Sequence, residues 1–358
     1  MLDDMRMRLL LVLLLVGALL MVAASWVSCA RPQAGGSVIP GVAVPVPAEM
    51  VRFEHVFVVV EENENYEEVI GNTKDLPYLN TLAAKYGLAT NYFANTHPSL
   101  NNYFYLTAGR SGTRSPWVGG MADLFPGEVA GDNIASILSA NGKTWKAYAE
   151  GIPGAGYVGG DRYPYVKRHN PFAYFENVRQ GKVASGQALP AASIVPFESF
   201  AGDLQHDSLP DYSFIVPNLY DDGHNDPVTR RGAACGDHRA LQNIDTWLKT
   251  NMEPLIQSDT FKRGGLLVIV FDEGCESGPK ADWRYDPNRR DIKGGGHIPA
   301  LIISSRTPAG TTRDGLYHHE SILRLSLRAL GVEHFPSGAK AAPDMDGFFS
   351  GKPENPRQ

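Results

Sequence analysis

The sequence predicts an α/β protein, a three-layer sandwich in which helices cover both faces of a mainly parallel central sheet. From residue 55 onward, short and almost wholly apolar runs alternate with helical patterns, which is typical of such sheets. The chain has 358 residues, 43% of them hydrophobic and 20% charged, so it can bury a core without support from a metal or disulfides. Any metal is therefore expected to serve chemistry.

Five apolar runs predict strands, and five segments with helical periodicity predict the covering helices. The strands are expected at residues 55–61 (HVFVVVE), 144–149 (TWKAYA), 212–216 (YSFIV), 265–271 (GLLVIVF) and 298–304 (IPALIIS). The helices are expected at residues 77–86, 99–107, 132–140, 238–255 and 320–330. Residues 151–205 are rich in Gly, Pro and aromatic side chains and have weak periodicity. We interpret them as an insertion over one edge of the sheet and as a candidate for substrate contacts.

Residues 1–28 are predicted to be a signal peptide. The uncharged run at residues 9–24 follows Arg6 and Arg8, as the apolar core of such a peptide does. Ser28 before Cys29 resembles the processing site of bacterial lipoproteins, in which the lipid is attached to the cysteine. A plain signal peptide cut near Ala30 and an uncleaved membrane anchor are the alternatives. We therefore expect an exported bacterial protein that is periplasmic, secreted, or held at the membrane through a lipid on Cys29.

Three further parts follow the signal peptide. Residues 29–50 are rich in Pro, Gly, Ala and Val without a polar periodicity, which predicts a flexible linker. Residues 51–335 hold all the predicted strands and helices and form the main domain. Residues 336–358 are expected to be a C-terminal tail.

The two cysteines outside the export region are a candidate disulfide. An exported chain reaches a compartment that permits disulfides. Cys275 follows a predicted strand closely and Cys235 lies in a Gly-rich loop, so we expect the two to pair. The alternative is two separate buried thiols.

The charge of the chain argues against nucleic acid as a partner. Lys and Arg number 33 against 39 Asp and Glu, which gives a net charge of -6. Proteins that bind nucleic acid by neutralising phosphates carry the opposite sign. We therefore expect no nucleic-acid partner.

Polar residues gather at one edge of the predicted sheet. Ligands of open parallel sheets bind beyond the carboxyl ends of the strands. The residues there are 61–63 (EEN), 217–224 (PNLYDDGH), 272–273 (DE) and 294–297 (GGGH). Taken alone, each of these segments also fits an ordinary acidic turn, a polar strand end or a histidine in a loop. Together, their carboxylates, amides and imidazoles would repel one another or stay unsatisfied without a cation, so we predict one or two divalent metal ions between them.

The ligand types limit the metal and its chemistry. They are rich in oxygen, include some imidazole and contain no thiolate, which suits Zn, Mn, Fe, Mg or Ca rather than a structural zinc. Composition does not choose among these ions. Such a site stabilises an attacking oxygen and the charge of a transferring phosphoryl group.

A candidate nucleophile lies in residues 96–103 (THPSLNNY). Ser99 is placed near the start of a predicted helix, where backbone N–H groups and the helix dipole favour an alkoxide and a phosphate. Asn102, one turn later, could donate to a phosphate oxygen. Two alternatives remain at this point: Ser99 is an ordinary N-cap, or Thr96 is the nucleophile.

The order of these motifs resembles a known family. EEN, THPSxNNY with LTAG, PNLYDDGH, GD, FDE and HIPALIIS together resemble the bacterial acid phosphatase and phospholipase C phosphoesterase family of the alkaline-phosphatase superfamily. The resemblance runs from His55 to about Phe335 and is greatest to the short secreted acid phosphatases. It implies an alkaline-phosphatase-like fold, with residues 51–335 as the phosphoesterase catalytic domain.

The resemblance also implies roles for single residues. Ser99 takes the position of the nucleophile and Asn102 that of the amide that follows it; His224 and His297 match further catalytic positions. The metal ligands would be Glu62, Asn63, Asp222, Asp272 and Glu273. This chain has Asn101 where the family commonly has Pro. It has Asp221-Asp222-Gly223-His224 where the family commonly has Asn-Asp-Met-His, which leaves open whether Asp221 or Asp222 is the ligand.

The expected function is that of an exported, metal-dependent acid phosphatase. Its substrate would be a phosphate ester, and Ser99 would form a phosphoserine intermediate that water then hydrolyses. The first alternative is a phospholipase C-type phosphodiesterase on phospholipids, which a lipid anchor and the aromatic-rich insertion would suit. The second is a non-catalytic lipoprotein that captures phosphate or a metal.

Overall fold

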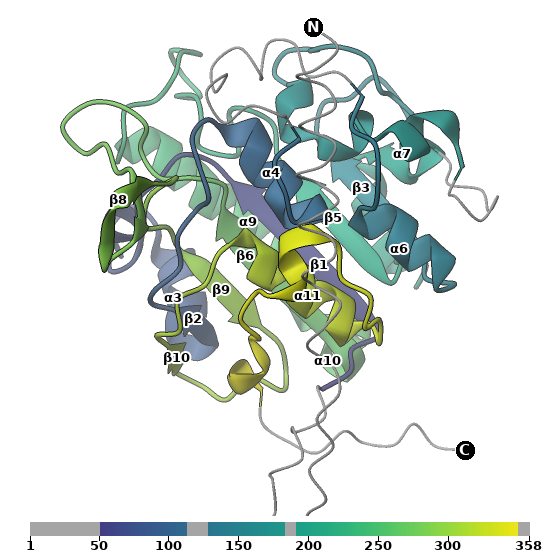
Figure 1. Cartoon of the computed structure of the whole chain (residues 1–358). Helices are drawn as coiled ribbons and strands as arrows, with labels where there is room; N and C mark the ends of the chain where they lie inside the picture. The colour runs from purple at the N-terminus through teal and green to yellow at the C-terminus, as the bar shows by residue number, and fades with distance from the viewer. Residues whose placement is uncertain (1–50, 113–127, 183–190, 350–358) are drawn as a thin grey trace, which may run out of the picture. The chain divides into compact units, whose positions relative to one another are not determined.

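The computed structural model describes residues 51–112, 128–182 and 191–349 (Figure 1). The predicted signal peptide, the linker and the lipidation site Cys29 lie outside the described residues. Among the helices of the described residues, none has both the length and the apolar character needed to cross a membrane.

The central sheet has eight strands in the order β10-β2-β9-β6-β1-β5-β3-β4. Its strands are β1 (His55–Glu61), β2 (Gly87–Ala89), β3 (Trp145–Ala149), β4 (Ile194–Pro196), β5 (Tyr212–Val216), β6 (Gly265–Phe271), β9 (Ala300–Ile303) and β10 (Thr311–Arg313). The five strands from β6 to β4 are parallel to their neighbours, and β9 runs antiparallel to both β6 and β2. A separate antiparallel pair consists of β7 (Arg284–Asp286) and β8 (Arg289–Lys293). The predicted α/β fold with a mainly parallel sheet is confirmed.

Helices cover both faces of this sheet, as Figure 1 shows. One face carries α4 (Ser99–Ala108), α6 (Ile134–Ala140) and α11 (His319–Ala329), and the other carries α3 (Pro77–Lys85), α9 (His238–Gln257) and α10 (Asp259–Gly264). The Tyr103 ring of α4 lies 6.2 Å from that of Phe214 on β5, and the Phe261 ring of α10 lies 6.3 Å from that of Phe57 on β1. Because both faces are covered, every residue of β6 is buried, which explains its unbroken apolar sequence.

The remaining helical elements are short and lie in the connections. They are α2 (Tyr66–Val69), α7 (Glu176–Gln180), α8 (Ser199–Gln205), and the 3₁₀ turns η1 (Lys167–His169), η2 (Pro171–Ala173), η3 (Ala191–Ser193), η4 (Ser337–Lys340) and η5 (Asp346–Phe348).

All ten predicted elements are present, with ends that differ by at most two residues from the prediction. The sequence did not indicate β2, β4 or β10, which have three residues each and are too short for an apolar period to appear. It also did not indicate that β9 is antiparallel, because a fully buried strand is apolar in either direction.

Residues 151–205 lie at one edge of the sheet, as expected, and include the edge strand β4 beside β3. Their aromatic side chains are mostly packed inside: Phe172 and Phe175 are fully buried, and the Phe172 ring lies 5.1 Å from that of Trp145 on β3. The aromatic composition of the insertion therefore reflects core packing.

The packed chain continues beyond Phe335, where a tail was predicted to begin. Met345 and Phe348 are buried, and the Gly338 N–H donates to the carbonyl of Gly109 at 2.9 Å. Residues 336–349, predicted to begin a C-terminal tail, thus contribute buried side chains to the packed part of the chain; residues 350–358 lie outside the described part.

The N-terminus of α9 depends on a side-chain cap. The Asp237 carboxylate accepts hydrogen bonds from the backbone N–H groups of Arg239 and Ala240 at 2.9 and 3.2 Å. These groups have no partner inside the helix, so the cap satisfies donors that would otherwise be lost.

We expect Asp237→Ala to lower the free energy of unfolding by about 1 kcal/mol, because the two N–H groups lose their acceptor. Asp237→Asn keeps an acceptor oxygen and should retain most of the stability. Urea denaturation followed by circular dichroism measures both variants. Equal stabilities of the Ala and Asn variants would show that the cap contributes nothing.

Candidate active site

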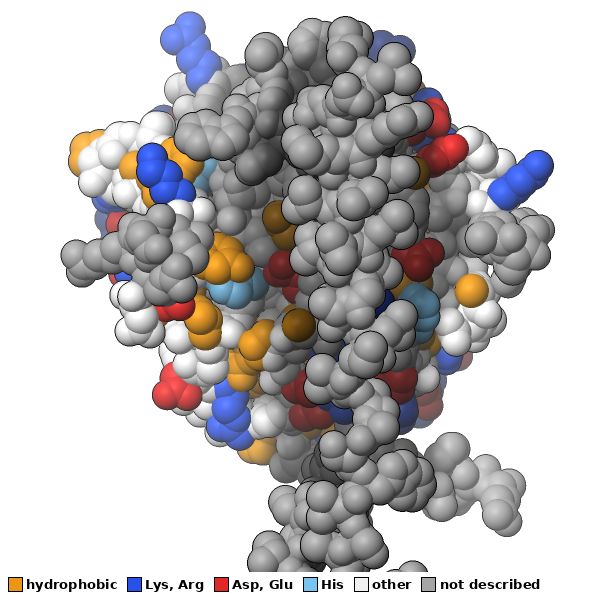
Figure 2. Space-filling model, viewed as in Figure 1, with side chains coloured by type: hydrophobic (Ala, Val, Ile, Leu, Met, Phe, Trp, Pro, Cys, Tyr) orange, Lys and Arg blue, Asp and Glu red, His pale blue; other side chains and the backbone are white. Residues whose placement is uncertain are grey.

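The candidate site lies at the carboxyl ends of three adjacent strands. Glu62 and Asn63 follow β1, Asp222 lies in the loop after β5, and Asp272 follows β6 directly. The start of α4 lies opposite these strand ends. On the face drawn in Figure 2, acidic and histidine side chains lie near the middle of the molecule among apolar ones. The structure thus brings together the residues that the sequence placed at this edge of the sheet.

Glu62 is the carboxylate nearest the predicted nucleophile. The Ser99 hydroxyl donates to Glu62 Oε2 at 3.2 Å, and the Tyr103 hydroxyl, one helical turn later, donates to Oε1 at 2.5 Å. Glu62 is fully buried. Burial and the like charges of Asp272 and Asp222 hold the pKa of Glu62 well above its usual range.

Ser99 is the first residue of α4, and the N-cap residue of this helix is Pro98. The alternative that Ser99 is an ordinary N-cap is therefore wrong in this structure, because its hydroxyl bonds Glu62 rather than the backbone of the helix. The rival nucleophile Thr96 donates its hydroxyl to the carbonyl of His97 at 3.0 Å. Within the described residues, the Ser99 hydroxyl therefore binds a carboxylate of the site and the Thr96 hydroxyl does not.

Asp272 is held by backbone N–H groups on one oxygen and lacks a partner on the other. Oδ1 accepts from the backbone of Glu273 at 2.6 Å and of Asn63 at 3.2 Å. Oδ2 is buried and has no hydrogen-bond partner among the described residues. Burial, partly offset by the backbone bond from Asn63, raises the pKa of Asp272 to about 6.

The side-chain amide of Asn63 faces two carboxylates. One end of it lies 2.8 Å from Glu62 Oε2 and 3.2 Å from Asp272 Oδ1. With nitrogen at that end, the amide donates to both carboxylates; with oxygen there, three oxygens converge as the ligands of a cation would.

The structure separates the two adjacent aspartates after β5. Asp222 is fully buried, and its Oδ1 accepts from the backbone of His224 at 2.8 Å. Asp221 accepts instead from the amides of Asn218 and Asn243, at 2.6 and 2.7 Å, on the side of the sheet that α9 covers. Of the pair, Asp222 is thus the residue that reaches the Glu62 side.

His169 joins Asp222 to Glu62. Its Nδ1 lies 3.2 Å from Asp222 Oδ2, and its Nε2 lies 3.3 Å from Glu62 Oε1. The ring stacks on Tyr103 at 5.4 Å, and burial lowers its pKa well below the usual range. His169 was not among the predicted site residues. No local sequence pattern indicates that η1 lies beside the ends of strands that are far from it in the chain.

Glu273, Asn102 and His97 form a second set of contacts beside Ser99. Asn102 Nδ2 donates to Glu273 Oε2 at 3.0 Å and to the carbonyl of Thr96 at 2.7 Å. His97 Nδ1 lies 3.2 Å from Glu273 Oε1. Asn102, predicted to donate to a phosphate oxygen, binds Thr96 and Glu273 through its amide hydrogens in this structure and so holds the loop before Ser99.

The two predicted catalytic histidines lie in different surroundings. His224 is close to the site, since its ring lies 5.8 Å from that of His169 and its Nε2 accepts from Arg168 at 3.2 Å. His297 is stacked between Tyr66 and Phe93, and its nitrogens face Glu67 and the carbonyl of Thr90. Within the described residues, His297 makes no hydrogen bond or ion pair with Glu62, Asp222 or Asp272, so the structure does not bring it to Ser99.

The glycines before His297 are explained by a close backbone approach. A Cβ atom on Gly295 would overlap the carbonyl oxygen of Thr96, and Gly296 has a φ of +90°. These glycines therefore let the chain pass close to the loop that carries Ser99.

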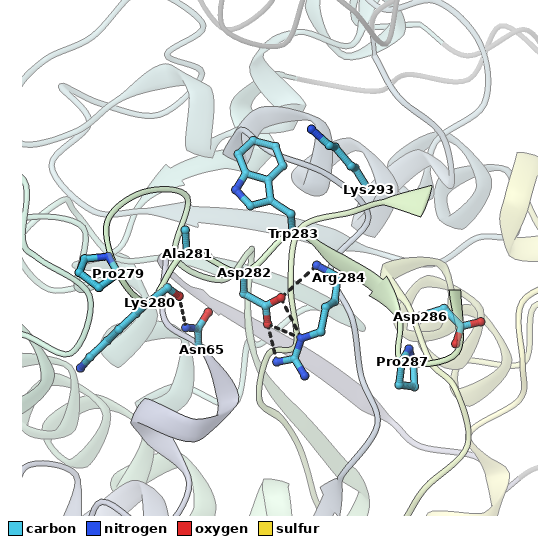
Figure 3. Close-up of a pocket in the computed structure, with 10 residues that line it drawn as sticks. All are labelled: Asn65, Pro279, Lys280, Ala281, Asp282, Trp283, Arg284, Asp286, Pro287 and Lys293. Atoms are coloured by element: carbon cyan, nitrogen blue, oxygen red, sulfur yellow. Dashed lines mark hydrogen bonds and ion pairs between the residues drawn. The ribbon is translucent and has the colours of Figure 1, made fainter. Parts of the chain in front are cut away.

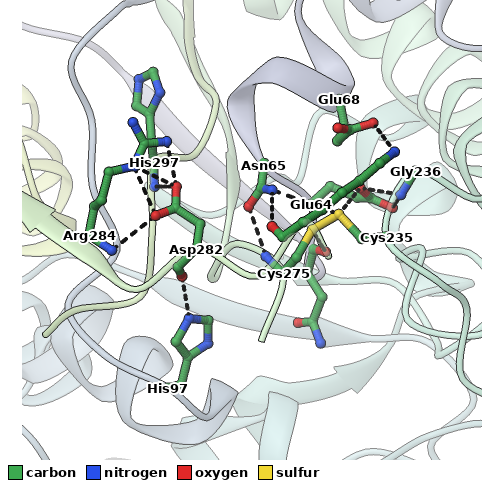
Figure 4. Close-up of a disulfide and its surroundings, with 12 residues drawn as sticks. Glu64, Asn65, Glu68, His97, Cys235, Gly236, Cys275, Asp282, Arg284 and His297 are labelled. Carbon is green, nitrogen blue, oxygen red and sulfur yellow. Dashed lines mark hydrogen bonds and ion pairs between the residues drawn. A yellow bond between two sulfur atoms is a disulfide. The ribbon is translucent and has the colours of Figure 1, made fainter. Parts of the chain in front are cut away.

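The predicted disulfide between Cys235 and Cys275 is present, with the two Cα atoms 5.8 Å apart (Figure 4). Cys275 follows the Asp272–Glu273 pair, and Cys235 lies in the loop beyond His224. Glu64 is packed against the disulfide and accepts from the Gly236 N–H at 2.9 Å; burial raises the pKa of Glu64 to about 8. The disulfide therefore ties two of the loops that carry site residues.

A pocket of about 840 Å³ adjoins the site beyond His97 (Figure 3). Trp283, which is 42% exposed, lines the pocket with its ring 4.4 Å from that of His97. Lys293 lies 5.8 Å above the indole, and Arg284 is paired with Asp282. The pocket thus offers an aromatic face and a cation next to the loop of Ser99.

The site residues fit a divalent cation. Single ligand atoms of Glu62, His169 and Asp222 all lie within 4.8 Å of one another, and Asp272 adds a buried oxygen without a partner. Such buried carboxylates repel one another unless a cation or protons neutralise them. The donors are oxygens and an imidazole, which suits the hard and borderline metals expected from the sequence.

Comparison with known proteins identifies relatives over most of the chain. Residues 72–332 match the model of the Phosphoesterase family. The phosphatidylinositol-3-phosphatase of Mycobacterium tuberculosis is 29% identical over 306 residues, which cover 84% of this chain and 82% of that protein. The phosphate-repressible acid phosphatase of Penicillium chrysogenum is 33% identical over 68% of this chain, and a probable acid phosphatase of Kluyveromyces lactis is 31% identical over 77% of it. The matches span 52% and 58% of those two fungal proteins, about half of their length.

Solved structures share the fold at low sequence identity. A protein of the alkaline phosphatase superfamily from Vibrio parahaemolyticus aligns with a TM-score of 0.52 at 15% identity, over 81% of this chain and 70% of that one. Murine ectonucleotide pyrophosphatase/phosphodiesterase 5 aligns with a TM-score of 0.52 at 10% identity, over 83% of this chain and 100% of that one. The predicted alkaline-phosphatase-like fold is confirmed. With the family match over residues 72–332 and these relatives, the chain belongs to the Phosphoesterase family and is a hydrolase that acts on phosphoric esters.

Proposed function

We propose that this protein is an exported, metal-dependent phosphomonoesterase of the acid phosphatase type that works through a phosphoserine intermediate. The observation that carries the proposal is the position of Ser99, whose hydroxyl starts α4 and donates to the buried Glu62 carboxylate at 3.2 Å. A binder of phosphate or metal needs no hydroxyl at this point. The relatives named as phosphatases support hydrolysis of monoesters.

The chemical step follows from the neighbours of Ser99. Its oxygen attacks phosphorus, and the Ser99 proton passes to Glu62 Oε2. The bond from phosphorus to the ester oxygen breaks, and the leaving oxygen takes up a proton from solvent water. Glu62 Oε2 lies 3.2 Å from the Ser99 hydroxyl, within hydrogen-bond reach of the proton that it would take up. Water then hydrolyses the phosphoserine and restores the hydroxyl.

The surrounding residues position these groups. Tyr103 and His169 hold Glu62 Oε1, so that Oε2 stays directed at Ser99. The N-terminus of α4 places backbone N–H groups near the phosphoryl group and favours its negative charge. Asn102 and His97 fix Glu273 and the loop before Ser99.

Glu62, Asn63, Asp222 and Asp272, with His169, would hold the cation. When bound, a divalent ion lowers the pKa of a coordinated hydroxyl and neutralises charge on a transferring phosphoryl group. Phosphodiester hydrolysis of the phospholipase C type remains the alternative, but most aromatic residues of the insertion are buried, and Tyr163 is the exposed one among those described.

We expect Ser99→Ala to lower kcat on p-nitrophenyl phosphate by about a hundredfold or more, because the nucleophile is lost. Thr96→Ala is the matched control and should keep near wild-type activity. Rapid quenching with a ³²P-labelled monoester should trap labelled wild-type protein and no labelled Ser99→Ala protein. Full activity of Ser99→Ala would refute the nucleophile assignment.

We expect His169→Gln to lower kcat/KM by about tenfold to a hundredfold, because the link between Glu62 and Asp222 is broken. His206→Gln, at an exposed helix end, is the control. Steady-state kinetics on the same ester measures both. If the two variants have equal activity, His169 has no part in positioning the carboxylates.

Removal of divalent ions by a chelator should abolish turnover, and one added metal should restore it, because the buried carboxylates repel one another without a cation. Activity of the restored protein on a phosphomonoester and on phosphatidylcholine separates the two candidate reactions. Higher kcat/KM on the lipid diester would replace the phosphatase proposal by the phospholipase one. Full activity after exhaustive chelation would exclude metal dependence.

A further inference from the structure

The pocket beside the candidate active site has no part in the chemical step proposed above. Its volume of about 840 Å³ falls within the range of about 300 to 1,000 Å³ that is usual for small-molecule sites (Figure 3). Residues 279–284, 286 and 287 form most of its lining, and Asn65 and Lys293 complete it. The fold therefore provides a binding space in addition to the carboxylates around Ser99.

His97 joins this pocket to the loop of the nucleophile. It precedes Ser99 by two residues, a stretch of chain that spans at most about 7 Å. The His97 Nε2 donates to the carbonyl of Asp282 at 2.8 Å, and the His97 ring lies 4.4 Å from the indole of Trp283. Its Nδ1 lies 3.2 Å from Glu273 Oε1, so both ring nitrogens have contacts. The Trp283 indole is therefore within reach of the part of an ester that extends beyond a phosphoryl group at Ser99.

Backbone hydrogen bonds hold the pocket against this loop. The Gly294 N–H, directly after Lys293, donates to the carbonyl of Trp283 at 2.9 Å. The Gly295 N–H donates to the carbonyl of Ala94, also at 2.9 Å. Lys293 and Trp283 are thus fixed to each other and to the segment that leads to Ser99. The pocket is largely formed before a ligand binds, which lowers the entropy cost of binding.

The indole of Trp283 is an exposed aromatic surface in this pocket. Trp283 is 42% exposed, whereas Trp145 and Trp247 are buried in the core. A ligand ring that covers an exposed indole removes apolar area from water and adds the attraction between aromatic rings. Trp283 therefore favours a ligand with a flat ring.

Lys293 is the cation of this pocket that lacks a carboxylate partner. Its Nζ lies 5.8 Å from the centre of the Trp283 ring, and it forms no ion pair with any described residue. The other two cations of the lining, Lys280 and Arg284, each pair with a carboxylate at 2.6 Å. Figure 3 shows the Lys293 side chain on the same side of the pocket as the indole. An ammonium in this position favours a ligand whose ring carries a negative charge.

We propose that the pocket around Trp283 binds the leaving group of the substrate and selects a flat ring that carries a second negative charge. In this arrangement the phosphoryl group lies at Ser99, the ring stacks on Trp283 and the anion pairs with Lys293. The substrate class is a phosphate monoester whose alcohol part bears an aromatic ring and a further anionic group. This assignment rests on the phosphomonoesterase function proposed above. Trp283 and Lys293 determine specificity and take no part in the chemical step.

Three monoesters test the contact with the ring: 4-carboxyphenyl phosphate, phenyl phosphate and glycerol 1-phosphate. We expect Trp283→Ala to lower kcat/KM on both aryl esters by about tenfold, mainly through a higher KM, because the stacked ring is lost. The loss on the glycerol ester should be clearly smaller, since that ester has no ring. Trp283→Phe keeps a ring and should restore most of the activity on the aryl esters. Equal losses on all three esters, or no loss on phenyl phosphate, would overturn the assignment.

The same esters test the contact with the charge. We expect Lys293→Met to lower kcat/KM on 4-carboxyphenyl phosphate by about threefold, because a partly exposed charge pair is lost. Phenyl phosphate lacks the carboxylate and should be affected less. Lys249→Met, at an exposed position of α9, is the matched control and should leave all three constants unchanged. Equal effects of Lys293→Met on the two aryl esters would refute the selection of a second negative charge.

Binding of 4-hydroxybenzoate, the alcohol released from 4-carboxyphenyl phosphate, tests the pocket without turnover. Saturation-transfer NMR should detect this compound on the wild-type protein and not on Trp283→Ala. Binding to wild type without hydrolysis of any monoester would refute the phosphatase function and leave the pocket as a ligand site. Hydrolysis of monoesters with equal transfer, or none, for wild type and Trp283→Ala would refute the pocket assignment alone.

Discussion

The structure of this protein depends on the burial of several carboxylates at the carboxyl ends of its parallel strands. Glu62, Asp222 and Asp272 are all fully buried, and each raises the pKa of its neighbours or has its own pKa raised. Burying such groups costs several kcal/mol each unless donors or cations compensate. The fold supplies some of this compensation through hydroxyl, imidazole and backbone N–H donors. Some carboxylate oxygens, such as Asp272 Oδ2, have no donor among the described residues, and a cation fits beside them.

The alternation of side chains along a strand divides these carboxylates between the two faces of the sheet. Glu61 and Glu62 are adjacent in sequence, but one points toward α9 and the other toward α4. Asp221 and Asp222, in the turn after β5, also separate: Asp221 binds Asn243 of α9 and Asp222 lies beside His169. The acidic residues at these strand ends therefore lie in two different surroundings, one with a hydroxyl and an imidazole nearby and one with amides and an indole.

Contacts between distant loops hold together the face of the sheet that carries Ser99. The disulfide joins the loop after β6 to the loop after β5, and His97 links Glu273 to the loop of Asp282 and Trp283. The insertion contributes His169 from η1, and its aromatic side chains anchor it against β3 and β5. Each of the groups around Ser99 is thus positioned by a segment far from it in sequence.

The sequence by itself determined the fold class, the main strands and helices, the disulfide pair, and the edge of the sheet at which Glu62, Asp222 and Asp272 meet. It could do so because wholly apolar runs require burial on both faces, and because parallel strands bring their carboxyl ends to one edge. Only the tertiary structure placed Asp222 and not Asp221 beside Glu62, added His169, stacked His297 between aromatic rings, and left Glu61 without a hydrogen-bond partner among the described residues. These outcomes depend on which side chains meet across the sheet, and neither local periodicity nor motif order contains that information.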